Sequence, residues 1–142
     1  MKAYADTSFL VSLYTPDTNS CAAAAQMKRS RAVVVVTPLG ELELLNALEL
    51  RIFRGELTRE EVEAAAVALR EDIHKGVYDL TSFPRAAFDR AKEIAGRQTA
   101  RLGTRTLDIL HVAAALVAQA DVFYSYDRNQ LRLARAEGLK VP

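Results

Sequence analysis

The chain has 142 residues, half of them hydrophobic, which predicts one globular domain spanning residues 1–142 with a substantial core. Its 19 basic and 18 acidic residues leave a net charge of +1, which excludes the overall charge bias of many nucleic-acid and membrane binders. No segment is long and apolar enough to span a bilayer, and the early Asp6 interrupts any signal peptide. A lone Cys21, expected as a small buried hydrophobe, excludes an internal disulfide and suits a cytoplasmic protein.

Strands and helices alternate along the chain. Short segments rich in β-branched or aromatic residues predict buried parallel strands at 2–6 and 32–37, with weaker candidates at 77–81 and 121–125. Helical patterns fill the intervals, at 7–14, 18–30, 39–54, 58–75, 84–102, 105–119 and 128–137. Thr58 and Glu61 form a predicted capping box, and Gly138 a helix C-cap. Because no hairpin dipeptide joins two strands, we expect an α/β fold, a three-layer α/β/α sandwich around a mainly parallel sheet.

Four carboxylates lie inside apolar sequence, where an ionised group is costly unless a partner compensates it: Asp6, Glu43, Asp108 and Asp127. Asp6 and Asp127 follow predicted strands, at the sheet edge where α/β proteins bind ligands, and Asp108 opens an almost wholly apolar helix. Taken singly, each acid is better explained by a helix cap or an ion pair with arginine. Together they favour a hard cation with oxygen ligands, Mg²⁺ or Mn²⁺.

The segments around these acids resemble the PIN-domain nucleases, and among them the VapC-type toxins, over essentially the whole chain. The matching segments are Ala5–Val11, Glu43–Leu48, Arg105–Ala115 and Phe123–Asp127. Each is short, but their order, spacing and coverage make the match specific. The resemblance implies a PIN-like sheet, with the four acids as catalytic and metal-binding residues.

The resemblance also implies a function. It implies an Mg²⁺- or Mn²⁺-dependent endoribonuclease that serves as the toxin of a toxin–antitoxin pair and leaves a 5′-phosphate and a 3′-hydroxyl. The expected partners are RNA, a small antitoxin protein and a second copy of the chain in a homodimer. Two alternatives stay open, an RNA-maturation nuclease and a non-hydrolytic RNA-binding or regulatory PIN module. One cysteine and two histidines leave little material for a Cys/His or Ser/His/Asp hydrolase.

The second acid has rivals on its own predicted helix, Glu41 and Glu49. Glu43 is preferred because, as in the family, an asparagine follows it three residues later, Asn46. Helical projection separates two stripes, one with Glu43, Leu39, Asn46, Ala47 and Leu50, the other with Glu41, Leu45, Leu48 and Ile52. The second stripe needs a partner, which is the core, a second subunit or an antitoxin segment.

Other polar residues near the four acids have two interpretations each. Thr7, Ser8 and Ser125 are candidates to hydrogen-bond a metal ligand or a phosphate, although Thr7 could instead cap its helix. Asn46 could orient a carboxylate or pack between helices. His111 is expected as a satisfied core histidine rather than a ligand. Six arginines flank the last two motifs, as a phosphate-binding rim or as solvated surface: Arg97, Arg101, Arg105, Arg128, Arg132 and Arg135.

Overall fold

A computed structural model describes all residues from 1 to 142 and contains one four-stranded sheet. The strands are β1 (Lys2–Ala5), β2 (Val33–Val36), β3 (Tyr78–Leu80) and β4 (Val122–Tyr124). They lie in the order β3-β2-β1-β4, and every pair is parallel. The chain therefore leaves all four strands at the same edge of the sheet, which is where the predicted acids follow β1 and β4.

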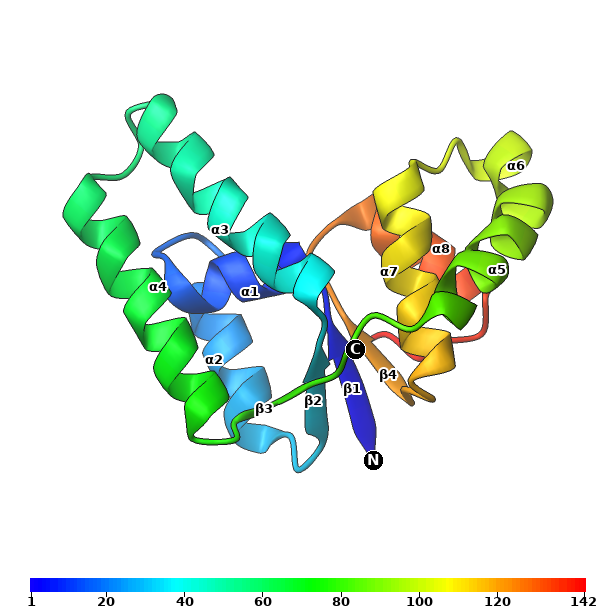
Figure 1. The fold of residues 1–142 in the computed structure, drawn as a ribbon, viewed down its shortest axis with the longest axis horizontal. Helices are drawn as coiled ribbons and strands as arrows, with labels where there is room; N and C mark the ends of the chain where they lie inside the picture. The colour runs from blue at the N-terminus through cyan, green and yellow to red at the C-terminus, as the bar shows by residue number, and fades with distance from the viewer.

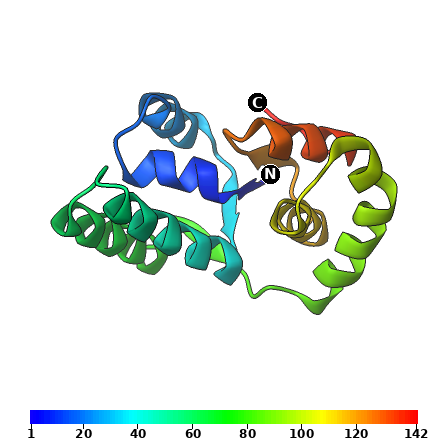
Figure 2. The ribbon, with the colours of Figure 1, turned by 90° about the horizontal axis from the view of Figure 1, so that it is seen from above.

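Helices cover both faces of this sheet. They are α1 (Thr7–Tyr14), α2 (Ser20–Arg29), α3 (Pro38–Phe53), α4 (Arg59–His74), α5 (Arg85–Ile94), α6 (Ala100–Leu102), α7 (Thr106–Val117) and α8 (Arg128–Ala136), with a π-helical segment η1 (Ala95–Thr99) between α5 and α6. Figures 1 and 2 show α1–α4 on one side of the strands and α5–α8 on the other. The predicted three-layer α/β/α sandwich is confirmed. No helix is both long enough and apolar enough to cross a membrane.

Alternation along the strands builds a separate core on each face of the sheet. Ala3 and Ala5 of β1 pack into the core beneath α1–α4, whereas Tyr4 between them packs into the core beneath α5, α7 and α8. The valines of β2 divide in the same way, with Val35 alone on the second face. Both faces are apolar because both are covered, which explains the continuous run of valines in the sequence.

Two details of the helices match or extend the sequence prediction. The capping box of α4 is confirmed, because Thr58 Oγ1 accepts from the amide of Glu61 at 3.2 Å and Glu61 Oε2 accepts from that of Thr58 at 2.7 Å. The helix predicted at 84–102 is interrupted by η1, where the amide of buried Gln98 donates to Glu137 Oε1 at 2.7 Å. This bond ties the π-helical turn to the end of α8.

One expectation from the sequence is wrong, and one alternative that the sequence left open is decided. Cys21 is exposed rather than buried, because α2 packs on the core through Ala23 and, in part, Met27, whereas Cys21 faces outward. The apolar stripe of α3 that needed a partner has the protein's own core as that partner. Leu48 is completely buried there, and Ile52 packs against the same cluster.

Candidate active site

The four predicted acids line one groove at the carboxyl edge of the sheet, with a volume of about 640 Å³. Asp6 follows β1 as the N-cap of α1, and Asp127 lies beyond β4 as the N-cap of α8. Glu43 comes from the second turn of α3 and Asp108 from the first turn of α7. Four separate elements therefore bring these side chains together.

Asp6 is almost completely buried and has hydrogen bonds to both of its carboxylate oxygens. Its Oδ1 accepts from the Phe9 amide at 3.0 Å and from Ser8 Oγ at 2.7 Å, while Oδ2 accepts from Ser125 Oγ at 2.6 Å. Burial raises the pKa of Asp6 above its ordinary value, and these hydrogen bonds only partly oppose that rise. The carboxylate is held rigidly, in a place where its negative charge lacks a compensating cation.

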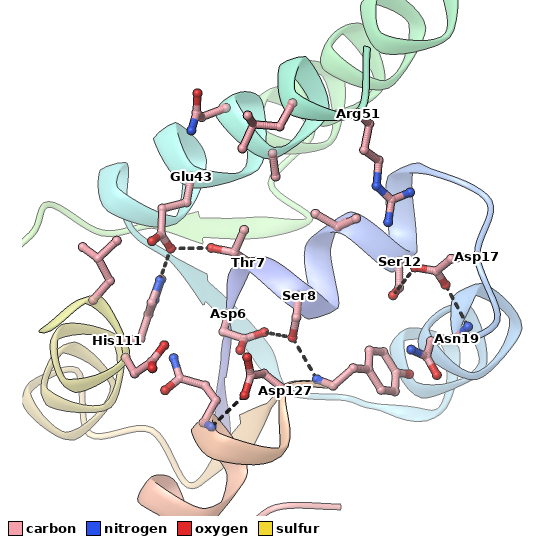
Figure 3. Close-up of a pocket in the computed structure, with 18 of the residues that line it drawn as sticks. Asp6, Thr7, Ser8, Ser12, Asp17, Asn19, Glu43, Arg51, His111 and Asp127 are labelled. Carbon is pink, nitrogen blue, oxygen red and sulfur yellow. Dashed lines mark hydrogen bonds and ion pairs between the residues drawn. The ribbon is translucent and has the colours of Figure 1, made fainter. Parts of the chain in front are cut away.

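Glu43 ends a chain of hydrogen bonds that begins in the protein core. Tyr4 Oη lies 2.9 Å from His111 Nδ1. His111 Nε2 hydrogen-bonds to Glu43 Oε2, which also accepts from Thr7 Oγ1 at 2.6 Å (Figure 3). An ionised carboxylate can only accept, so His111 Nε2 is the donor in its hydrogen bond to Glu43. Burial alone would raise the pKa of Glu43, but the bonds from His111 and Thr7 outweigh it and lower this pKa.

Asp108 and Asp127 share an arginine. Arg105 Nε donates to Asp108 Oδ2 at 3.1 Å, and Arg105 Nη2 lies 3.8 Å from Asp127 Oδ2. The other oxygen of Asp127 accepts from the amides of Asn129 and Gln130 at 2.8 and 3.1 Å, as expected for a helix N-cap. One guanidinium thus compensates two of the four acids.

The structure assigns contacts to the other polar candidates. Thr7 does not cap α1, because Asp6 occupies the cap position and frees the Thr7 hydroxyl for Glu43. Ser8 and Ser125 both donate to Asp6, and Ser125 Oγ also accepts from the Asp127 amide at 3.0 Å. Asn46 is exposed and lines the groove. His111 is buried with both ring nitrogens hydrogen-bonded, as expected of a satisfied core histidine.

The rival acids and most of the flanking arginines lie away from the groove. Glu49 pairs with Arg59 at 2.6 Å on the surface, and Glu41 is not among the groove-lining residues. Among the six flanking arginines only Arg105 lines the groove, and Arg97 instead pairs with Glu137 at 2.6 Å. A complete phosphate-binding rim of six arginines is therefore wrong, and solvated surface describes the others.

Sequence reasoning missed several lining residues. Arg51 and Arg54 line the groove from the end of α3, and Asp17 and Asn19 from the connection between α1 and α2. Gln130 was also missed: it is buried against the groove, and its Oε1 has no hydrogen-bond partner. No local pattern distinguishes these residues from surface arginines and amides, and only Gln130, three residues after Asp127, is close to one of the four acids in the sequence.

The donor set fits a hard divalent cation by chemistry. Four carboxylates converge on the groove, and the orphaned carbonyl oxygen of Gln130 adds the oxygen type that Mg²⁺ and Mn²⁺ prefer. No three of the His, Cys, Asp and Glu side chains form a cluster ready to hold one ion. An ion here would accordingly be bound by some of the carboxylates directly and by the rest through water.

A comparison with protein-family models matches residues 3–136 to the PIN domain. The chain belongs to the PIN domain family. The match includes all four acids, so the groove of this PIN domain lies wholly within the matched region. No curated protein matches the chain significantly.

Solved structures share this PIN fold at low sequence identity. The toxin VapC20 of Mycobacterium tuberculosis, described as cleaving the sarcin–ricin loop, superposes with a TM-score of 0.72 and 21% identity, over 97% of this chain and 96% of that one. PAE2754 of Pyrobaculum aerophilum gives 0.67 and 18%, over 99% and 83%. VapBC2 of Rickettsia felis, bound to a promoter DNA fragment, gives 0.67 and 13%, over 100% and 98%.

Proposed function

We propose that this PIN domain is a metal-dependent endoribonuclease that acts as the toxin of a toxin–antitoxin pair. The observation that carries the proposal is the convergence of Asp6, Glu43, Asp108 and Asp127, from four separate elements, on one groove. Burying one carboxylate beside three others is costly unless a cation or a positively charged partner compensates them. Family membership and the fold shared with VapC20 support hydrolysis of RNA as the use of that cation.

The chain's own residues hold the carboxylates and supply no nucleophile. Ser8, Ser125 and the Phe9 amide fix both oxygens of Asp6, so this ligand needs no reorganisation when a cation arrives. Thr7 and His111 hold Glu43 ionised. Bound Mg²⁺ or Mn²⁺ would lower the pKa of a coordinated water and offset the charge of the scissile phosphate. Water would then be the nucleophile that attacks the scissile phosphate.

The proposed antitoxin would recognise the negative charge of the same groove. A small protein that inserts an Arg or Lys into the groove would pair with the carboxylates through charge-assisted hydrogen bonds and block both metal and RNA. The apolar stripe of α3 is not available to it, because Leu48 and Ile52 belong to the core. Leu50 and Leu107 are exposed at the groove and supply an apolar contact instead. We further propose that the protein is a homodimer and acts in the cytoplasm.

The nuclease activity is tested by incubating the purified protein with total ribosomal RNA, which contains the sarcin–ricin loop named for VapC20. We expect cleavage in Mg²⁺ or Mn²⁺ and none in excess EDTA. An Asp6→Asn protein purified in parallel controls for contaminating nucleases. Cleavage that persists in EDTA, or that both proteins show equally, would overturn the metal mechanism.

The toxin role is tested by induced expression in a host without the partner. Growth arrest by the wild type and not by Asp6→Asn supports the proposal. Arrest by both proteins alike would contradict a nuclease toxin. If neither arrests growth while the purified wild type cleaves RNA, a maturation nuclease is the better description; if neither activity is found, a non-hydrolytic RNA-binding module is.

A further inference from the structure

Arg105 occupies the position that a cation would take beside two of the acids. Its guanidinium contacts Asp108 Oδ2 at 3.1 Å and Asp127 Oδ2 at 3.8 Å, so one oxygen of each carboxylate faces it. These two acids have no other cationic partner, since no other ion pair involves them. Without a metal, the arginine is therefore their charge compensation.

The guanidinium is free to move, unlike the groups it touches. Its side chain is 71% exposed, against 14% and 35% for Asp108 and Asp127. Arg105 precedes the first residue of α7 in an extended conformation and makes no capping bond to that helix. Gly103, in the left-handed region at φ 64°, ends α6 two residues earlier. Withdrawing this side chain breaks no packing in either core.

We propose that Arg105 exchanges partners during the catalytic cycle: it pairs with Asp108 and Asp127 in the metal-free site, and a divalent cation displaces it onto an RNA phosphate. This inference rests on the proposed function. A cation that reaches the Oδ2 atoms of both acids and a guanidinium already paired with them compete for the same lone pairs. The site should therefore bind a metal ion less tightly than the same acids would bind it without the guanidinium beside them.

The displaced guanidinium remains at the groove because its Cα is fixed at the start of α7. A scissile phosphate near the bound ion lies within reach of this side chain, and the planar fork of arginine suits two phosphate oxygens. Arg51 and Arg54 also line the groove, but of the three lining arginines only Arg105 pairs with Asp108 and Asp127. Removing Arg105 should therefore have opposite effects on the two ligands: the metal should bind more tightly and RNA less tightly. A merely structural residue would weaken both.

The test compares wild type, Arg105→Gln and Arg132→Gln. Arg132 is a matched control, because it is exposed on α8, makes no ion pair and does not line the groove, yet its loss changes the net charge equally. Isothermal titration with Mn²⁺ alone gives the metal affinity. Fluorescence anisotropy with a labelled 20-nucleotide single-stranded RNA, checked intact by gel, gives the RNA affinity in Ca²⁺ and in EDTA.

For Arg105→Gln we expect Mn²⁺ to bind about three- to tenfold more tightly, the size of one exposed guanidinium lost from two carboxylates. RNA binding in Ca²⁺ should weaken by about the same factor and change by less than about twofold in EDTA, and Arg132→Gln should change the metal affinity by less than about twofold. Unchanged or weaker Mn²⁺ binding by Arg105→Gln, or unchanged RNA binding in Ca²⁺, would overturn the exchange while leaving the nuclease intact. A wild type that binds no Mn²⁺ would overturn both.

Discussion

Asp6 and Glu43, the hydroxyl-held pair, differ from Asp108 and Asp127, the arginine-held pair. Groups held in place by the fold donate hydrogen bonds to the first pair: two serines and an amide to Asp6, a threonine and a histidine to Glu43. An exposed guanidinium compensates the second pair. The donors of the first pair can stay in place when a metal arrives, whereas the guanidinium must leave.

This difference separates two tasks within one site. The hydroxyl-held pair is preorganised, because its hydrogen bonds fix the orientation of the carboxylates. The arginine-held pair is neutralised until a stronger cation replaces the guanidinium. Ser125 connects the two, since its hydroxyl donates to Asp6 at 2.6 Å and accepts from the Asp127 amide at 3.0 Å.

The largest effect is expected at Asp6. Asp6→Asn removes a charge from the best-ordered carboxylate and should lower RNA cleavage by at least about 100-fold, more than the loss of a supporting partner. Asp127→Asn keeps the oxygen that caps α8 and should lower cleavage only about tenfold. Initial cleavage rates at saturating Mn²⁺ measure both. A greater loss in Asp127→Asn would reverse the assigned importance of the two pairs.

Ser125 supports both pairs and should matter next. Ser125→Ala leaves Asp6 Oδ2 and the Asp127 amide without their shared partner, so Mn²⁺ affinity or cleavage should fall about 10- to 100-fold. Ser12→Ala is the matched control, because its hydroxyl also lines the groove but donates to Asp17 at 2.7 Å. Equal losses in the two variants would show a general effect of hydroxyl removal.

Stability should respond to Asp6 in the opposite direction to activity. Burial raises the pKa of Asp6 in the folded state, so its contribution to stability is present at low pH and lost as the pH rises through that pKa. In EDTA at pH 7.5, Asp6→Asn should therefore have a higher Tm than the wild type. Thermal unfolding followed by circular dichroism should show this gain shrinking toward acidic pH. A lower Tm for the variant at pH 7.5 would contradict the burial penalty.

The smallest effect is expected at the rival acid. Glu41 lies outside the groove, so Glu41→Gln should change cleavage by less than about twofold, as surface substitutions usually do. Glu43→Gln should lower cleavage by about 100-fold, because His111 and Thr7 hold Glu43 toward the other acids. Parallel cleavage assays of the two variants decide between neighbouring glutamates. Comparable losses of cleavage in the two variants would contradict the choice of Glu43 over Glu41.

The sequence predicted the layers because hydrophobic periodicity and caps are local signals. The valines of β2 and the Thr58 capping box read directly as the strand and helix observed. It also predicted which acids are unusual, since apolar neighbours make a carboxylate conspicuous. The partners of those acids were harder to predict from the sequence. Helical spacing places Arg105 three residues from Asp108 and Gln130 three residues from Asp127, but the contact of Arg105 with Asp127 depends on the fold.

The prediction for Cys21 failed for a related reason. In a run of four alanines the neighbouring side chains are alike, so the sequence does not say which residue faces the core; Ala23 does, with Met27 one turn later. His111 was correctly expected to be buried, but its hydrogen bond to Glu43 joins α3 and α7, which lie on opposite faces of the sheet and are 68 residues apart at these positions. Long-range contacts of this kind leave no periodic signal.

The most direct measurement of the central claim is an anomalous difference map from crystals soaked in Mn²⁺. The account predicts a peak in the groove bounded by Asp6, Glu43, Asp108 and Asp127, with the Arg105 guanidinium withdrawn from Asp108 and Asp127. A groove without a peak in fully soaked crystals, and with Arg105 still bridging the two acids, would contradict it.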